Sequence, residues 1–230
     1  MPETNTNNHG ENNAGEKIIF FIHDNRRKIF ISLGSVLAIL VIFIGVLAIR
    51  DGLTARNISR VEDFNRRYDV LRITIAEESA AEDIAVLLAD LSAFAPKTPG
   101  YSGSRAYALI AGIHGDRKEW AEAEQAWQAA AKKAGKSYLA PVALFNAASA
   151  AEAQGKIPEA IALYGECLAM PDSFPSAPRA QFAIGRLEEA RGNREAALEA
   201  YRALRAAWPN DAIWRNLAQS RIISLEGEGF

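Results

Sequence analysis

The amino-acid sequence predicts an all-α protein in which a single transmembrane helix precedes an α-solenoid of stacked helix pairs. Three observations carry this prediction. Residues 29–49 contain no charged side chain. Beyond them, apolar residues recur three and four positions apart, which is the period of one face of a helix. In the last part of the chain, an alanine followed four positions later by an aromatic residue recurs at about the spacing of helix-pair repeats.

The composition excludes several classes of protein. The 230 residues are 49% hydrophobic and 23% charged, with a formal net charge of −2. The chain therefore lacks the basic excess of a nucleic-acid-binding protein and the polarity of a disordered one. Its one cysteine, Cys167, cannot form an internal disulfide or a thiolate metal cage. We expect no nucleic acid, metal or cofactor among its ligands.

Residues 1–28 are predicted to form a largely disordered cytoplasmic tail. Met1 to Glu16 is rich in Asn, Glu and Gly and has almost no aliphatic side chains. Such a segment cannot bury enough surface to offset the cost of ordering it. A short apolar patch at 17–22 and a basic cluster at 26–28 complete the tail.

Residues 29–49 are predicted to form the transmembrane helix. At the helical rise they span about 31 Å, which matches a hydrocarbon core of roughly 30 Å. A cleaved signal peptide is the alternative, but its apolar region is shorter and ends in small residues, whereas Arg50 and Asp51 follow here. Basic residues flank both ends of the helix, and the compact cluster at 26–28 predicts a cytoplasmic N-terminus and a C-terminal domain outside the inner membrane.

Residues 50–98 are predicted to form amphipathic helices that lead into the repeats. The first has a stripe of apolar side chains from Val61 to Ile75, and the second has one from Ile84 to Phe94. Residues 102–209 follow as three helix pairs. Residues 210–225 are predicted to form a helix that caps the last pair, with Asn210 or Asp211 as its N-cap.

The repeats are marked by a small residue, a glycine loop and an aromatic side chain. The alanine and aromatic pairs are Ala123 with Trp127, Ala160 with Tyr164, and Ala197 with Tyr201. Glycine loops precede the last two at 155–158 and 192–195, whereas the loop at 115–118 is displaced, so we expect the first copy to depart in its turn.

These residues resemble the tetratricopeptide repeat. In the third copy, Gly185, Ala197, Tyr201 and Pro209 fall in the register of that family, and Ala148 and Ala111 hold the small position in the other copies. The resemblance implies close helix crossings at the small residues and a concave binding surface. An unrelated helical bundle is the alternative, because alanine-rich amphipathic helices are common.

The layout of the chain is similar to that of the YfgM-like ancillary subunits of the bacterial secretion translocon. It has Phe20 and Phe21 shortly before Asn25 and a basic group, then one transmembrane helix, an amphipathic helix and degenerate repeats. The resemblance implies an inner-membrane protein with its repeat domain in the periplasm, beside translocon subunits and periplasmic chaperones.

The stacked pairs predict a concave surface lined by the first helix of each pair. Its forward-facing and clamp-like positions form the candidate peptide-binding groove: Arg105, Val142, Phe145, Asn146, Ser149, Arg179, Phe182 and Arg186. Aromatic rings offer contact area and arginines bind carboxylates, so an extended peptide or an acidic tail fits this surface. Because Ala108, Gly112 and Ala183 occupy three of five clamp positions in the family register, a full carboxylate clamp is absent.

Catalytic motifs are missing from the sequence. It has no His-Glu-x-x-His zinc motif, no phosphate-binding loop and no Gly-x-Ser-x-Gly elbow. We interpret Gly100 to Ser104 as a helix start capped by serine, and Cys167 as a buried side chain. The sequence therefore predicts a membrane-anchored scaffold for protein partners rather than an enzyme. Association with secretion is one hypothesis, and a scaffold for envelope assembly or cell division is the other.

Overall fold

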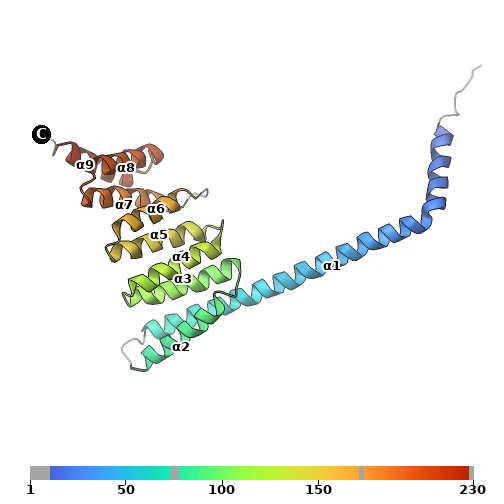
Figure 1. Ribbon diagram of the computed structural model, residues 1–230, viewed down its shortest axis with the longest axis horizontal. Helices are drawn as coiled ribbons and strands as arrows, with labels where there is room; N and C mark the ends of the chain where they lie inside the picture. Colours follow the sequence, from blue (N-terminus) through green and yellow to red (C-terminus); the bar gives the residue numbers. More distant parts are fainter. Residues whose placement is uncertain (1–10, 74–77, 171–173, 228–230) are drawn as a thin grey trace, which may run out of the picture. The chain divides into compact units, whose positions relative to one another are not determined.

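The computed structural model describes residues 11–73, 78–170 and 174–227, and within these ranges the structure consists of helices and the turns that join them (Figure 1). The all-α prediction is confirmed. The helices are α1 (Glu11–Ile73), α2 (Glu78–Phe94), α3 (Gly100–Asp116), α4 (Trp120–Ala134), α5 (Leu139–Ala153), α6 (Ile157–Leu168), α7 (Ala177–Ala190), α8 (Arg194–Ala207) and α9 (Ala212–Gly227). The chain divides into two compact units, Met1–Ala55 and Arg56–Phe230.

Helix α1 differs from the sequence prediction at both ends. It begins at Glu11, so the last part of the predicted disordered tail is helical, and residues 1–10 lie outside the described part of the chain. It also runs without a break through residues 29–49 and on to Ile73. Once a helix is nucleated, each added residue adds one hydrogen bond, so polar neighbours can extend an apolar helix. By length and composition α1 could cross a membrane.

The second unit begins with a core shared by the end of α1, α2 and α3. Phe64 of α1 meets Phe94 of α2 edge to face, with ring centroids 5.5 Å apart. Leu87 and Leu91 of α2 are fully buried in the same cluster, together with Ile113 of α3. The apolar side chains of residues 61–71 and 84–94 thus pack against the first helix of the repeats.

Three helix pairs follow, α3 with α4, α5 with α6, and α7 with α8 (Figure 1). Small residues let the helices of a pair approach closely. A Cβ atom added to Gly185 of α7 would lie 2.6 Å from the ring of Tyr201 of α8, which is fully buried. Ala148 of α5 and Ala160 of α6 are likewise fully buried.

Helix α9 covers the last pair. Ala218, Ile222 and Leu225 of α9 pack against a cluster that contains Tyr201 of α8. The backbone N–H of Trp214 donates to the Asp211 carboxylate at 3.2 Å, so Asp211 is the N-cap of this helix. The predicted cap is therefore present.

The turns inside the three pairs share one geometry, which corrects the expectation that the first copy departs. In each turn a backbone N–H donates to the carbonyl five residues earlier. The donors are Glu119 with an N···O distance of 2.9 Å, Lys156 with 3.0 Å and Asn193 with 2.9 Å. The residue before each donor has a positive φ, 74° at Gly155 and 77° at Gly192. Lys118 takes this position in the first pair with φ of 60°. The positive φ of Lys118 was not predicted from the sequence, because glycine normally occupies such a position.

The start of α3 also differs from the prediction. Its N-cap position is Pro99, which has no side-chain capping bond, and the helix begins at Gly100. Ser104 lies within the helix and does not cap it. Its hydroxyl donates to the Ala130 carbonyl of α4 at 3.0 Å. Close packing of α3 on α4 therefore decides the role of this serine.

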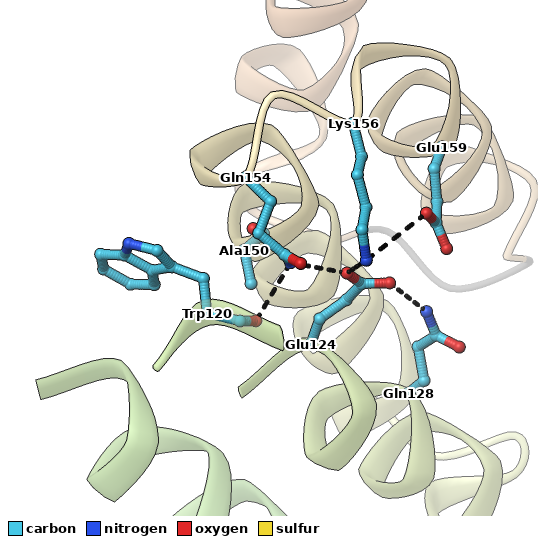
Figure 2. A network of polar contacts seen from close by, with 7 residues as sticks. All are labelled: Trp120, Glu124, Gln128, Ala150, Gln154, Lys156 and Glu159. Carbon is cyan, nitrogen blue, oxygen red and sulfur yellow. Dashed lines mark hydrogen bonds and ion pairs between the residues drawn. The ribbon is translucent and has the colours of Figure 1, made fainter. Parts of the chain in front are cut away.

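A buried polar network joins the first pair to the second (Figure 2). The carboxylate of Glu124 on α4 accepts hydrogen bonds from Gln154 at 2.7 Å and Lys156 at 3.0 Å, both in the turn between α5 and α6. Gln128, one turn along α4, donates to its other oxygen at 2.9 Å. We call these four residues the Glu124 network. Hydrogen bonds from these three neighbouring side chains offset the cost of burying the charged Glu124 carboxylate.

The network stabilises the charged forms of its members. Burial raises the pKa of the Glu124 carboxyl, but the hydrogen bonds from Lys156 and Gln154 outweigh it and leave the pKa below its ordinary value. The hydrogen bond to Glu124 in turn raises the pKa of the Lys156 ammonium. Glu124 and Lys156 therefore form an ion pair at neutral pH.

Candidate functional site

The second and third helix pairs, together with α9, line a groove with a volume of about 540 Å³, which is within the range of known ligand pockets. We call it the aromatic groove. Helices α5, α7 and α9 supply most of its wall, and α6 supplies one residue. The lining residues are Phe145, Ser149, Glu152, Ala153, Tyr164, Arg179, Phe182, Ala183, Arg186, Trp214 and Leu217.

Two pairs of aromatic rings contribute to the lining of this groove. Phe145 of α5 meets Tyr164 of α6 edge to face, with centroids 5.4 Å apart. Phe182 of α7 packs at 5.6 Å against Trp214 of α9. Each contact joins different helices, so packing holds the rings in place. Phe145 and Tyr164 are buried, whereas Phe182 and Trp214 are half-buried and offer the more accessible apolar surface.

A hydroxyl pair supports the first of these ring pairs. Ser149 donates its single proton to the Phe145 carbonyl at 3.0 Å, so the hydroxyl of Tyr164, which lies 3.0 Å from Ser149, is the donor to it. Burial raises the pKa of Tyr164, so the hydroxyl remains protonated in this role. Ser149 and Tyr164 therefore hold the wall of the groove and are not a nucleophile and its base.

The two arginines of the groove have different surroundings. A terminal nitrogen of Arg186, Nη2, lies 2.7 and 2.8 Å from the two carboxylate oxygens of Glu152. The guanidinium of Arg179 instead lies over the Phe145 ring, with Cζ 5.4 Å from the centroid. Among the described residues, Arg179 has no carboxylate partner, so it is the cation that can receive an acidic group from a ligand.

A second hollow adjoins the aromatic groove. This hollow shares Phe182 and Arg186 with the aromatic groove and adds Glu189 and Arg221. Glu189 accepts hydrogen bonds from Arg221 and, at 3.0 Å, from the Tyr201 hydroxyl. Its carboxylate is thus occupied by groups of α8 and α9.

The structure brings together five of the eight residues that the sequence placed in a groove. Phe145, Ser149, Arg179, Phe182 and Arg186 line the aromatic groove, whereas three others do not. Of these three, Arg105 of α3 lies with its Nη2 3.7 Å from Glu62 of α1. Val142 and Asn146 lie on α5, half-buried and outside the lining.

The contribution of α9 was missed at the sequence level. The sequence predicted only that the helix at 210–225 covers the last pair, yet its Trp214 and Leu217 line the groove. Their spacing of three residues places them on one side of a helix. No pattern in the sequence indicates that this side meets α7, because that depends on the angle at which α9 packs.

The remaining candidates for chemistry have structural partners. Cys167 is buried, its thiol donates to the Pro141 carbonyl at 3.3 Å, and burial raises its pKa to about 11. His114 lies 2.6 Å from Glu119, in the turn between α3 and α4. Within the described ranges, no cluster of three or more His, Cys, Asp or Glu side chains could hold a metal ion.

Comparison with known proteins identifies the repeats. Residues 109–168 and 154–212 each match the model of the tetratricopeptide repeat family. The chain is also 35% identical over 224 residues to a TPR repeat-containing protein of Treponema pallidum (strain Nichols), an alignment that covers 91% of this chain and 93% of that protein. The similarity therefore extends beyond the repeats, and it excludes an unrelated helical bundle.

Proposed function

This chain belongs to the tetratricopeptide repeat family, and we propose that it is a membrane-anchored scaffold that holds an extended segment of a partner protein in the aromatic groove. Repeats of this family suggest a scaffold for protein–protein interaction, and proteins of the family are in general not enzymes. The proposal adds the site, the chemistry of the ligand and the anchor.

The observation that carries the proposal is a single groove that combines aromatic rings with one arginine for which the described residues supply no carboxylate partner. Rigid rings such as Phe182 and Trp214 offer apolar contact area at a small cost in conformational entropy. Arg179 lies beside them with its guanidinium over Phe145. A peptide with an apolar or aromatic side chain close to a carboxylate would satisfy both features.

The anchor and its orientation rest on the sequence. The apolar stretch 29–49 is as long as a bilayer core is thick, and the basic cluster 26–28 favours an N-terminus in the cytoplasm. This arrangement would place the repeats on the outer face of a bacterial inner membrane. The layout shared with the YfgM-like subunits favours translocon subunits and periplasmic chaperones as partners, and an envelope-assembly or division scaffold is the alternative.

Crosslinking of the full chain in membranes, followed by identification of the captured proteins, tests the proposal. Phe182→Ala combined with Arg179→Gln should lower partner capture by about 30-fold, the effect of losing about 2 kcal/mol at a binding hot spot. Arg202→Gln is the matched control, because Arg202 lies on α8 and pairs with Glu226 away from the groove.

The outcomes separate the parts of the proposal. Unchanged capture by the double variant, with an intact helical circular dichroism spectrum, would show that the partner binds elsewhere. Capture of translocon subunits or chaperones would support the secretion hypothesis, whereas cell-wall or division proteins would support the alternative. Protection of the repeats from protease added to spheroplasts would contradict the orientation.

A further inference from the structure

A second apolar surface lies at the start of α1, outside the stretch that is long enough to cross a membrane. Residues 18–22 are Ile, Ile, Phe, Phe and Ile, and each of these side chains is between 51% and 75% exposed. We call them the N-terminal apolar segment. Six polar or basic residues, 23–28, separate the segment from the stretch 29–49.

The arrangement of the segment favours lipid over a protein groove. Successive residues of an α-helix point about 100° apart, so five consecutive apolar side chains point in every direction around the axis. A groove on another protein covers one face of a helix and would leave the rest of these side chains in water. The acyl and headgroup boundary of a bilayer can instead surround such a helix on most sides.

The distance from the membrane stretch requires a bend in the helix if the segment is to lie at this boundary. From Ile22 to Ile29 the helix rises by about 10 Å, whereas each headgroup region of a bilayer is roughly 5–8 Å thick. Figure 1 shows that α1 bends near its start, within the unit Met1–Ala55. Between the two apolar stretches, the Asn25 side chain donates to the Phe21 carbonyl at 3.1 Å, a type of contact that competes with the backbone ladder. A bend near the start of α1 lets the segment lie along the surface.

The charge beside the segment identifies the lipid. Arg26, Arg27 and Lys28 are all exposed, and the only acidic residue among 23–28 is Asp24. Basic residues next to a membrane are attracted to anionic headgroups. We propose that the N-terminal apolar segment inserts into the headgroup boundary of an anionic phospholipid surface, where the three basic side chains hold the headgroups. This inference rests on the proposed membrane anchor.

The environment of a fluorescent label on the full chain tests the proposal. NBD is attached to a cysteine introduced as Ile19→Cys, with Ile39→Cys as the reference in the membrane stretch and Glu199→Cys as the reference in water. The high pKa of buried Cys167 keeps that thiol from reacting at neutral pH. The protein is reconstituted in phosphatidylcholine vesicles with and without phosphatidylglycerol.

The expected result is a blue shift of the emission at position 19 relative to position 199, and the shift should be larger with phosphatidylglycerol. Replacing Arg26, Arg27 and Lys28 by Gln should remove this dependence on phosphatidylglycerol, whereas Arg66→Gln should leave it unchanged. A spin-labelled lipid should quench position 19 most strongly when its label is near the headgroup, and position 39 when its label is near the acyl end.

Three results would overturn the proposal. Emission at position 19 equal to that at position 199 would place the segment in water. A blue shift that does not respond to phosphatidylglycerol, or a response to phosphatidylglycerol that the triple Gln variant retains, would exclude the anionic headgroups. Water-like emission at position 39 would instead overturn the membrane anchor itself, so the two failures are distinguishable.

Discussion

Two glutamates of neighbouring junctions make similar ion pairs in very different surroundings. Glu124 accepts from Lys156 at 3.0 Å, between the first and second helix pairs, and its side chain is 5% exposed. Glu152 accepts from Arg186 at 2.7 Å, between the second and third pairs, and these two side chains are 27% and 48% exposed. Distance alone would rank the second pair as the stronger one.

Burial reverses that ranking. Water screens the Arg186 pair, and most exposed pairs contribute little to folding. The Glu124 carboxylate has lost its water and depends on three donors from its own chain. We infer that the first junction is held by its polar network, whereas the second leaves its charged groups accessible to a partner.

Removing the buried carboxylate should have the largest effect. Glu124→Ala removes the acceptor of the hydrogen bonds from Gln128, Gln154 and Lys156, so we expect the free energy of unfolding to fall by about 2–3 kcal/mol. Urea denaturation measures this change. Glu159→Ala is the control, because its carboxylate is exposed and lies 4.0 Å from Lys156, and it should cost less than about 0.5 kcal/mol. Equal losses in the two variants would contradict a special role for Glu124.

The same network should make stability depend on pH. The pKa of Glu124 is below its ordinary value in the folded protein, so its contribution is complete above about pH 4.3 and is lost as the pH falls through the folded pKa. The raised pKa of Lys156 acts at the other extreme, where stability is lost as the pH rises through it. Urea midpoints between about pH 3 and pH 7 should fall less steeply for Glu124→Gln than for the unmodified chain. Parallel curves would show that the carboxylate contributes nothing on acidification.

Breaking the exposed pair should have the smallest effect on stability. Arg186→Gln removes the ion pair with Glu152, and we expect the free energy of unfolding to change by less than about 1 kcal/mol. The urea midpoint of this variant, measured beside Glu124→Ala, completes the comparison. If Arg186→Gln destabilised the fold as much as Glu124→Ala, exposure would not explain the difference between the junctions.

The helices and the repeats were predictable from the sequence because their signals are local. The apolar period of three and four residues, the glycine loops and the small residue at Gly185 lie within single helices or turns. The contact of Gly185 with Tyr201 follows once a helix pair is assumed. The turn at Lys118 was missed because its positive φ is imposed by the same hydrogen bonds that form around glycine in the other pairs.

The groove was predictable only in part. The forward positions of α5 and α7 follow from the repeat register, and Phe145, Arg179 and Phe182 line the groove together. Arg105 belongs to the same register but lies on α3, away from this lining. Which positions converge depends on how far the stacked pairs turn relative to one another, and helix periodicity contains no information on that turn.

The sequence by itself therefore determined the helical class, the apolar stretch 29–49 and the phase of each repeat, because each depends on residues within a few positions of one another. Only the tertiary structure decided that Trp214 meets Phe182 and that Lys156 reaches Glu124, 32 residues away in the chain. Such contacts depend on the packing angle between helix pairs. That angle results from the combined fit of many side chains rather than from any single motif.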